Sequence, residues 1–135
     1  MQPEKNSFTK FERLCSKKLF SELFENGNSF NSFPFRVVWT YNPSPINSPS
    51  QIAISVPKRT FKKAVDRNLI KRRIKEAFRK NKHQLYDYLE SNNKKIIFVL
   101  IYRESTISDY VKTEKAVLNM LKKLVAILKE RENKS

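Results

Sequence analysis

Residues 58–82 read KRTFKKAVDRNLIKRRIKEAFRKNK and carry twelve Lys or Arg residues against only two carboxylates, Asp66 and Glu76. The segment therefore holds +10 of the chain's net charge of +15. Its apolar residues recur with helical spacing and fall within one arc of about 100°, namely Ile70, Ile74, Ala77 and Phe78. This pattern predicts a helix that buries the apolar arc, and we expect Asp66 to cap its N-terminus.

The arc beside the apolar one carries cations and one amide: Asn68, Lys71, Arg72, Lys75 and Arg79. Solvated helices usually mix Glu with Lys four residues apart, whereas the cations here are almost unopposed. Such a face suits a polyanion, because Lys and Arg release counterions when they neutralise phosphates. The segment predicts binding to RNA or DNA, and an anionic membrane is the competing polyanion.

Length and composition indicate one compact α+β domain over residues 1–135, with an ordered core at about 8–130. Hydrophobic residues make up 39% of the chain and include ten Phe, while Gly occurs once, which argues against a disordered basic tail. No apolar run approaches the ~18 residues that span a bilayer, and the N-terminus lacks a signal-peptide core. Cys15 is the only cysteine and cannot form an internal disulfide. We expect a soluble, cytoplasmic protein without membrane contact.

Hydrophobic patterning predicts the remaining elements. A helix is expected over 17–25, and alternating segments at 33–41 and 51–56 predict two strands that pair antiparallel across a loop with three prolines. The nearly continuous apolar run at 94–103 is typical of a strand buried on both faces. Apolar residues at 3-4 spacing from 117 to 128 predict a long C-terminal helix that begins after Ser108 and Asp109.

The first helix has recognisable end signals. Ser16 stands where an N-cap is preferred, and Gly27, the only glycine, stands where a helix end favours a left-handed residue. Within the helix, Phe20 and Phe24 belong to an apolar stripe, and Phe at this spacing is most often a core residue.

Few residues could carry chemistry by themselves. His83 is the only histidine and reads as a surface residue, while Glu130 and Glu132 lie in a solvated C-terminal tail. No Asp/Glu set has the spacing of metal ligands, and a single Gly cannot build a Gly-rich phosphate loop. We therefore expect no catalytic residue and no metal site in this chain.

Two consecutive segments resemble the signature of the bacterial ribonuclease P protein component family. They are AISVPKR at 53–59 and AVDRNLIKRRIKEAFR at 64–79, beside the family's G-(I/L)-S-V-S-K-K strand and its A-V-x-R-N-R-(I/V)-K-R-x-(I/L)-R-(E/Q)-A-F motif. The stretch at 12–30 is similar to the family's first helix, and the resemblance covers most of residues 8–130. The chain departs from the pattern at Ala53 (Gly in the family), Pro57 (Ser) and Leu69 (the second Arg of R-N-R).

The resemblance implies an α+β fold, a two-layer α/β sandwich whose mixed four-stranded sheet has a left-handed crossover through the basic helix, in the order α-β-β-β-α-β-α. It implies a protein subunit of ribonuclease P that binds the ribonuclease P RNA and the 5′ leader of precursor tRNA and supports 5′ maturation. The RNA would perform the hydrolysis with Mg²⁺ that it holds itself. No further protein partner is implied.

Carried over by position, the resemblance assigns RNA binding to Lys58, Arg59, Arg67, Asn68, Lys71, Arg72 and Lys75, and the cationic arc adds Arg79. It assigns a leader cleft to Phe20, Phe24, Val38 and Ser55, although Val38 replaces the larger residue often found there. We also hypothesise that Arg73 reaches back along the helix and supplies the cation that Leu69 lacks, the alternative being a solvent-exposed arginine.

Two other functions remain open from the residues alone. One is a structural RNA-binding protein, such as a ribosomal or assembly factor, which binds without cleavage. The other is a protein-only nuclease, which the shortage of metal ligands and bases disfavours.

Overall fold

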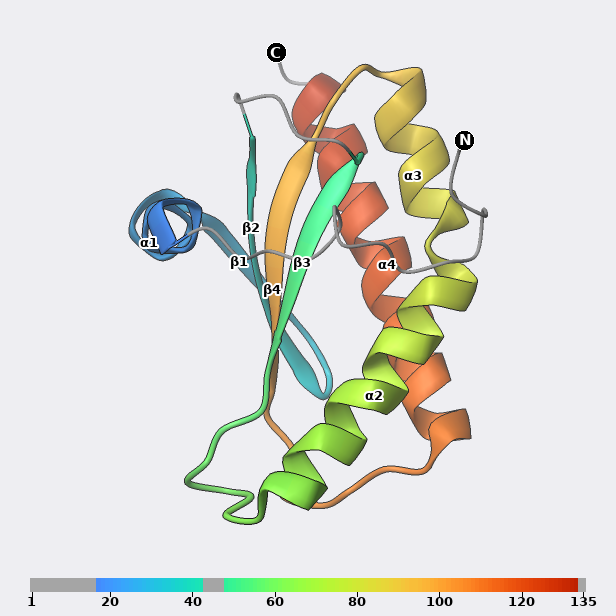
Figure 1. Cartoon of the computed structure of the whole chain (residues 1–135). Helices are drawn as coiled ribbons and strands as arrows, with labels where there is room; N and C mark the ends of the chain where they lie inside the picture. Colours follow the sequence, from blue (N-terminus) through green and yellow to red (C-terminus); the bar gives the residue numbers. More distant parts are fainter. Residues whose placement is uncertain (1–16, 43–47, 134–135) are drawn as a thin grey trace, which may run out of the picture.

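The computed structural model describes residues 17–42 and 48–133. Its elements follow in the order α1 (Lys17–Asn26), β1 (Asn28–Ser32), β2 (Phe35–Tyr41), β3 (Ser50–Ser55), α2 (Ala64–Asn81), α3 (His83–Ser91), β4 (Ile96–Tyr102) and α4 (Tyr110–Asn133). The strands form one four-stranded sheet, with α2, α3 and α4 on one face and, within the described residues, only α1 on the other (Figure 1). The expected α+β architecture with a mixed sheet is confirmed.

The strand order in the sheet is β1-β2-β4-β3, with β4 antiparallel to β2 and parallel to β3. The predicted antiparallel pair of the second and third strands is therefore wrong, because β4 lies between them. All residues of β4 except Ile101 are buried, and such a strand is most stable with a neighbour on each side. Leu100, for example, lies opposite Val37 on one side and Ile54 on the other.

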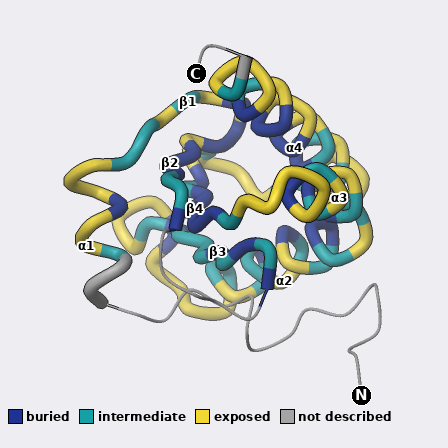
Figure 2. The backbone as a smooth tube through the Cα atoms, turned by 90° about the horizontal axis from the view of Figure 1, so that it is seen from above, coloured by how far each residue is buried: buried dark blue, intermediate teal, exposed yellow. Residues whose placement is uncertain are grey.

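The connection from β3 to β4 runs through α2 and α3 on the helical side of the sheet, and it is left-handed (Figures 1 and 2). Crossovers between parallel strands are otherwise almost always right-handed. The nine-residue helix α3 was not expected and buries Leu85 and Leu89. Strand β1 was expected only through the family resemblance, because its polar sequence NSFNS shows little apolar alternation.

The sheet carries a hydrophobic core on each face, and the two differ greatly in size. The main core fills the space between the sheet and α2, α3 and α4, and includes Trp39, Phe78 and Phe98. A smaller core lies under α1 and consists of Leu23, Val38, Ile97 and Val99. Viewed along the strands, the three helices enclose one side of the sheet while the short α1 covers part of the other (Figure 2).

Two expected helix ends differ in detail. Helix α2 begins at Ala64, with Lys63 at the N-cap position and no side-chain cap bond, so the predicted cap at Asp66 is wrong. Asp66 lies instead in the first turn, where its charge still favours the positive helix end. The start of α4 is confirmed, since Asp109 Oδ1 accepts a hydrogen bond from the Lys112 amide at 2.9 Å.

Gly27 follows α1 as predicted, but its φ is not positive, so the left-handed conformation expected there is wrong. A different constraint applies. The Gly27 amide donates to the Leu23 carbonyl oxygen at 2.8 Å, and a Cβ at position 27 would lie 2.2 Å from that oxygen. Glycine is therefore needed for close approach of the two backbones. The predicted N-cap, Ser16, lies outside the described residues.

Candidate nucleic-acid interface

Helix α2 separates its apolar and cationic residues as the sequence predicts. Its buried residues are the four of the predicted arc, Ile70, Ile74, Ala77 and Phe78. Among the predicted contacts, Asn68, Arg72 and Lys75 are exposed, while Arg67, Lys71, Arg73 and Arg79 are half-buried. The left-handed crossover packs α2 mainly on α4 (Figure 1). Its four buried residues are apolar, and its predicted RNA contacts are left exposed or half-buried.

The loop before α2 is fixed from both ends and carries two further cations. Phe61 is buried, with its ring centroid 6.0 Å from that of Tyr102. Arg67 Nη1 donates hydrogen bonds to the carbonyl oxygens of Phe61 (2.8 Å) and Lys62 (3.0 Å). Lys58 and Arg59 remain exposed on this loop, beside the start of the helix. Arg67 thus also holds the loop that presents them.

Arg73 has a partner in a distant part of the chain. Its Nη1 donates a hydrogen bond of 2.7 Å to the carbonyl oxygen of Ser108, just before α4. The side chain therefore ties α2 to the start of α4, which the sequence did not suggest. Its compensation for Leu69 stays a prediction, and Arg73→Ala would remove this tie as well as the cation.

The C-terminal end of the cationic arc is partly neutralised. Arg79 donates two hydrogen bonds to Glu76, from Nε at 3.1 Å and from Nη2 at 2.5 Å, and Lys80 Nζ lies 3.9 Å from the same carboxylate. The hydrogen bond from Arg79 lowers the pKa of Glu76 and raises that of Arg79. Glu76 thus neutralises part of the positive charge at this end of α2, which the sequence analysis did not anticipate. Lys82 is almost fully buried, with its ammonium 5.1 Å from the ring of Tyr86.

Releasing Arg79 is expected to strengthen RNA binding. Glu76→Gln removes the carboxylate that the guanidinium binds, so one more cation can neutralise a phosphate. The slope of log K against log salt should become more negative by about 0.7 to 0.9, measured by filter binding across salt concentrations. Asp66→Asn is the matched control, because it makes the same change in charge without freeing Arg79. Equal effects of both variants would contradict a specific role for Arg79.

The other face of the sheet carries a second candidate surface, between α1 and the strands. Leu23 is fully buried and fixes α1 to the sheet, whereas Phe24 is 51% exposed and Phe20 is half-buried. The ring centroids of Phe20 and Phe24 lie 5.3 Å apart. Phe24 is therefore not a core residue, and Phe20 contributes to the smaller core only in part.

The two strand residues predicted to contact the leader differ in exposure. Val38 lies on the predicted face but is only 5% exposed, because it packs in the smaller core beneath α1. It supports α1 from beneath and is not available as an exposed contact. Ser55 is half-buried and lies opposite Ile101, which lies opposite Arg36 on β2. Arg36 is exposed and was not predicted, although its alternation with Phe35 and Val37 placed it on this face.

Other chemistry finds little support within the described residues. No group of three or more His, Cys, Asp or Glu there could hold a metal ion. His83 begins α3 and is half-buried. Within the same part of the chain, no helix combines the length and apolar character needed to cross a bilayer.

Comparison with known proteins agrees with this geometry. A sequence model of the ribonuclease P family matches residues 8–125. The ribonuclease P protein component of Porphyromonas gingivalis is 31% identical over 119 residues, covering 88% of this chain and 87% of that protein. The corresponding protein of Petrotoga mobilis is 32% identical over 126 residues, covering 91% of this chain and 99% of that protein.

Solved structures give the same result. The ribonuclease P protein from Thermotoga maritima superposes with a TM-score of 0.64 at 28% identity, covering 83% of this chain and 96% of that one. The ribonuclease P protein of Staphylococcus aureus, at 23% identity and a TM-score of 0.62, covers 82% of this chain and 93% of its own and supports the fold alone.

The fold and the two surfaces define an α+β protein with a mixed sheet and one strongly cationic helix. The chain belongs to the ribonuclease P protein component family, whose members are parts of a tRNA-processing endonuclease.

Proposed function

We propose that this chain is the protein subunit of a ribonuclease P particle that binds the ribonuclease P RNA through α2 and the 5′ leader of precursor tRNA through the surface formed by α1 and the adjacent face of the sheet. The outward cationic face of α2, in a chain of this family, is the observation that carries the proposal. The particle would act in the cytoplasm on the 5′ ends of tRNAs.

Binding of the RNA by α2 follows from charge and position. Asn68, Arg72 and Lys75 are exposed, and Lys58 and Arg59 extend the cationic surface beyond the helix start. Because the buried arc holds α2 against α4, the helix already presents Asn68, Arg72 and Lys75 before any RNA binds. Several phosphate contacts of this kind give affinity that falls steeply with salt.

Binding of the leader by this surface is supported by its aromatic and polar residues. Phe20 and Phe24 offer rings on which unpaired bases can stack, and Ser55 and Arg36 can bind the bases and the phosphates that pass over the sheet. Single-stranded RNA is commonly recognised by such stacking on a sheet face.

The chemistry itself is assigned to the RNA. The described part of the chain offers no set of ligands that fits Mg²⁺, so the metal would be held by RNA oxygens and supply charge stabilisation there. The role of the protein is to bring RNA and substrate together and to neutralise their mutual repulsion.

Reconstitution tests the proposal directly. Purified chain, ribonuclease P RNA and precursor tRNA are combined at low Mg²⁺, and cleavage is followed on a gel. Faster 5′ cleavage with both components than with the RNA alone supports the proposal. Binding without any effect on cleavage would indicate a structural RNA-binding protein, and cleavage by the chain alone would indicate a protein nuclease.

Phe24→Ala is expected to weaken binding of precursor tRNA by about 5- to 150-fold, the loss of about 1–3 kcal/mol for one base stack, while binding of mature tRNA stays unchanged. Affinities of the reconstituted particle for the two RNAs, measured by gel shift, check this. Because Phe24 is exposed, the variant should fold normally, which thermal unfolding can verify. An equal loss for both RNAs would remove Phe24 from the leader site.

A further inference from the structure

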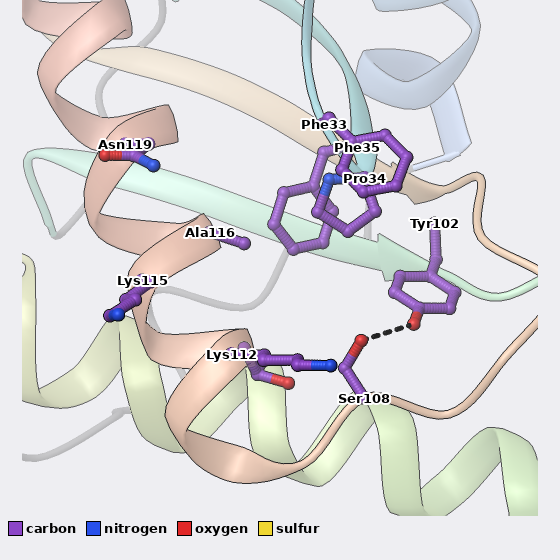
Figure 3. A pocket seen from close by; sticks show the side chains of 10 residues that line it. Phe33, Pro34, Phe35, Tyr102, Ser108, Lys112, Lys115, Ala116 and Asn119 are labelled. Atoms are coloured by element: carbon purple, nitrogen blue, oxygen red, sulfur yellow. Dashed lines mark hydrogen bonds between the residues drawn. The ribbon is translucent and has the colours of Figure 1, made fainter.

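A pocket of about 280 Å³ lies between the β1–β2 turn and the first turns of α4, on the helical side of the sheet (Figure 3). Phe33 and Pro34 come from the turn, Phe35 and Tyr102 from the sheet, and Ala116 from α4. In the close-up, the rings of Phe33, Pro34 and Phe35 gather on one side, and Ala116 faces them from α4. The volume lies below the usual range for drug-sized ligands and suits one flat ring system.

Hydrogen bonds to neighbouring residues hold the segments that line the pocket. The Pro34 carbonyl oxygen accepts a hydrogen bond from the Arg103 amide at 2.8 Å, and Tyr102 Oη donates to the Thr106 carbonyl oxygen at 2.7 Å. The Ser108 carbonyl oxygen accepts from Arg73, as described above. Because these contacts fix the turn, the strand end and the start of α4, the pocket needs little rearrangement to accept a ligand.

Two properties of the rim indicate what the pocket accepts. Phe33 is 78% exposed, so that its ring is open to stacking by a partner. Lys112 and Lys115 are the charged residues of the lining, and Asn119 adds an exposed amide that can bind polar ring edges. None of the ten lining residues is acidic. In the close-up the Lys112 ammonium group lies beside Ser108, and Lys115 lies further along the rim (Figure 3). An aromatic wall with cations at its rim is complementary to a flat ring that carries an anion.

We propose that this pocket binds one unpaired nucleotide of an RNA, with the base stacked against Phe33 and its phosphate near Lys112 and Lys115. The charge of the rim favours a nucleotide over an apolar protein segment. The site lies on the helical side of the sheet, whereas α1 and the proposed leader surface lie on the other (Figure 1). This nucleotide site rests on the proposed function in one respect, namely that the partner of the chain is an RNA.

Amide NMR spectra of the whole chain, titrated separately with AMP, uridine and inorganic phosphate, test this site without any ribonuclease P RNA. AMP should give saturable shifts at Phe33, Ala116 and Asn119, uridine weaker ones, and phosphate none at Phe33. Phe33→Ala should weaken AMP binding at least about fivefold, the lower end of the loss of one base stack. Lys112→Ala with Lys115→Ala should reduce the affinity for AMP at these amides several-fold.

Val111→Ala is the matched control, because Val111 is an exposed apolar residue of α4 outside the pocket lining. Its AMP affinity should equal that of the unmodified chain. AMP shifts confined to α2, or equal shifts with phosphate alone, would overturn the proposal. Shifts at the pocket with indole but none with AMP would also overturn it and indicate an apolar partner. Since reconstituted cleavage is measured separately, failure here is distinguishable from failure of the proposed function.

Discussion

Reversing Lys71 and Lys75 together to Glu is expected to weaken binding of the ribonuclease P RNA about 100-fold at 0.05 M salt, with little difference left near 1 M. Each lost phosphate contact makes the slope of log K against log salt less negative by about 0.7 to 0.9, so the pair accounts for about 1.4 to 1.8. Over the roughly 20-fold range of salt, this change in slope gives the stated loss. Filter binding at several salt concentrations measures both quantities.

The variant should keep its fold, because Lys75 is exposed, Lys71 is only half-buried, and the buried residues of α2 are the four of its apolar arc. The matched control reverses Lys94 and Lys122, which changes the charge equally at exposed positions outside α2. A control that loses as much affinity would show that net charge, and not the face of α2, determines binding. Unfolding of the α2 variant would contradict the assignment of its faces.

The parts of this fold that the sequence predicted are those with a strong local period. The apolar arc of α2 follows from 3.6-residue spacing, and β4 follows from an unbroken apolar run. The position of β4 between β2 and β3, in contrast, has no local signal in the sequence. It depends on burial of both its faces, which is a property of the whole sheet and cannot be read from the loop between β2 and β3.

In the candidate interface, too, features with a local sequence pattern were predicted and features that depend on tertiary packing were not. The cations of α2 were found because they lie on one helical face, and the Arg79–Glu76 pair could have been found from its spacing of three residues. The bond from Arg73 to Ser108 joins residues 35 positions apart, so no local pattern reveals it. Phe20 and Phe24 have similar spacing signals, and only the packing of α1 on Leu23 shows that Phe24 is exposed.

Leu23→Ala is expected to release α1 from the sheet while the main core stays folded. Among the described side chains of α1, Leu23 is the only one that is fully buried, and it packs on Val38, Ile97 and Val99. Loss of a buried Leu typically costs about 2–5 kcal/mol, which is large for a ten-residue helix held by this small core. Because the main core lies on the other face, the loss should appear as local opening of α1.

Hydrogen exchange followed by NMR separates local from global opening. In Leu23→Ala, the amides of α1 should exchange at nearly unprotected rates, while those of β4 stay as slow as in the unmodified chain. Phe24→Ala should leave the exchange of α1 unchanged, since its side chain is exposed. Faster exchange of β4 to the same extent as α1 would mean that both faces of the sheet unfold together. If α1 opens alone, Leu23→Ala should also abolish discrimination for the leader while the salt-dependent binding through α2 remains, because the two surfaces lie on opposite faces of the sheet.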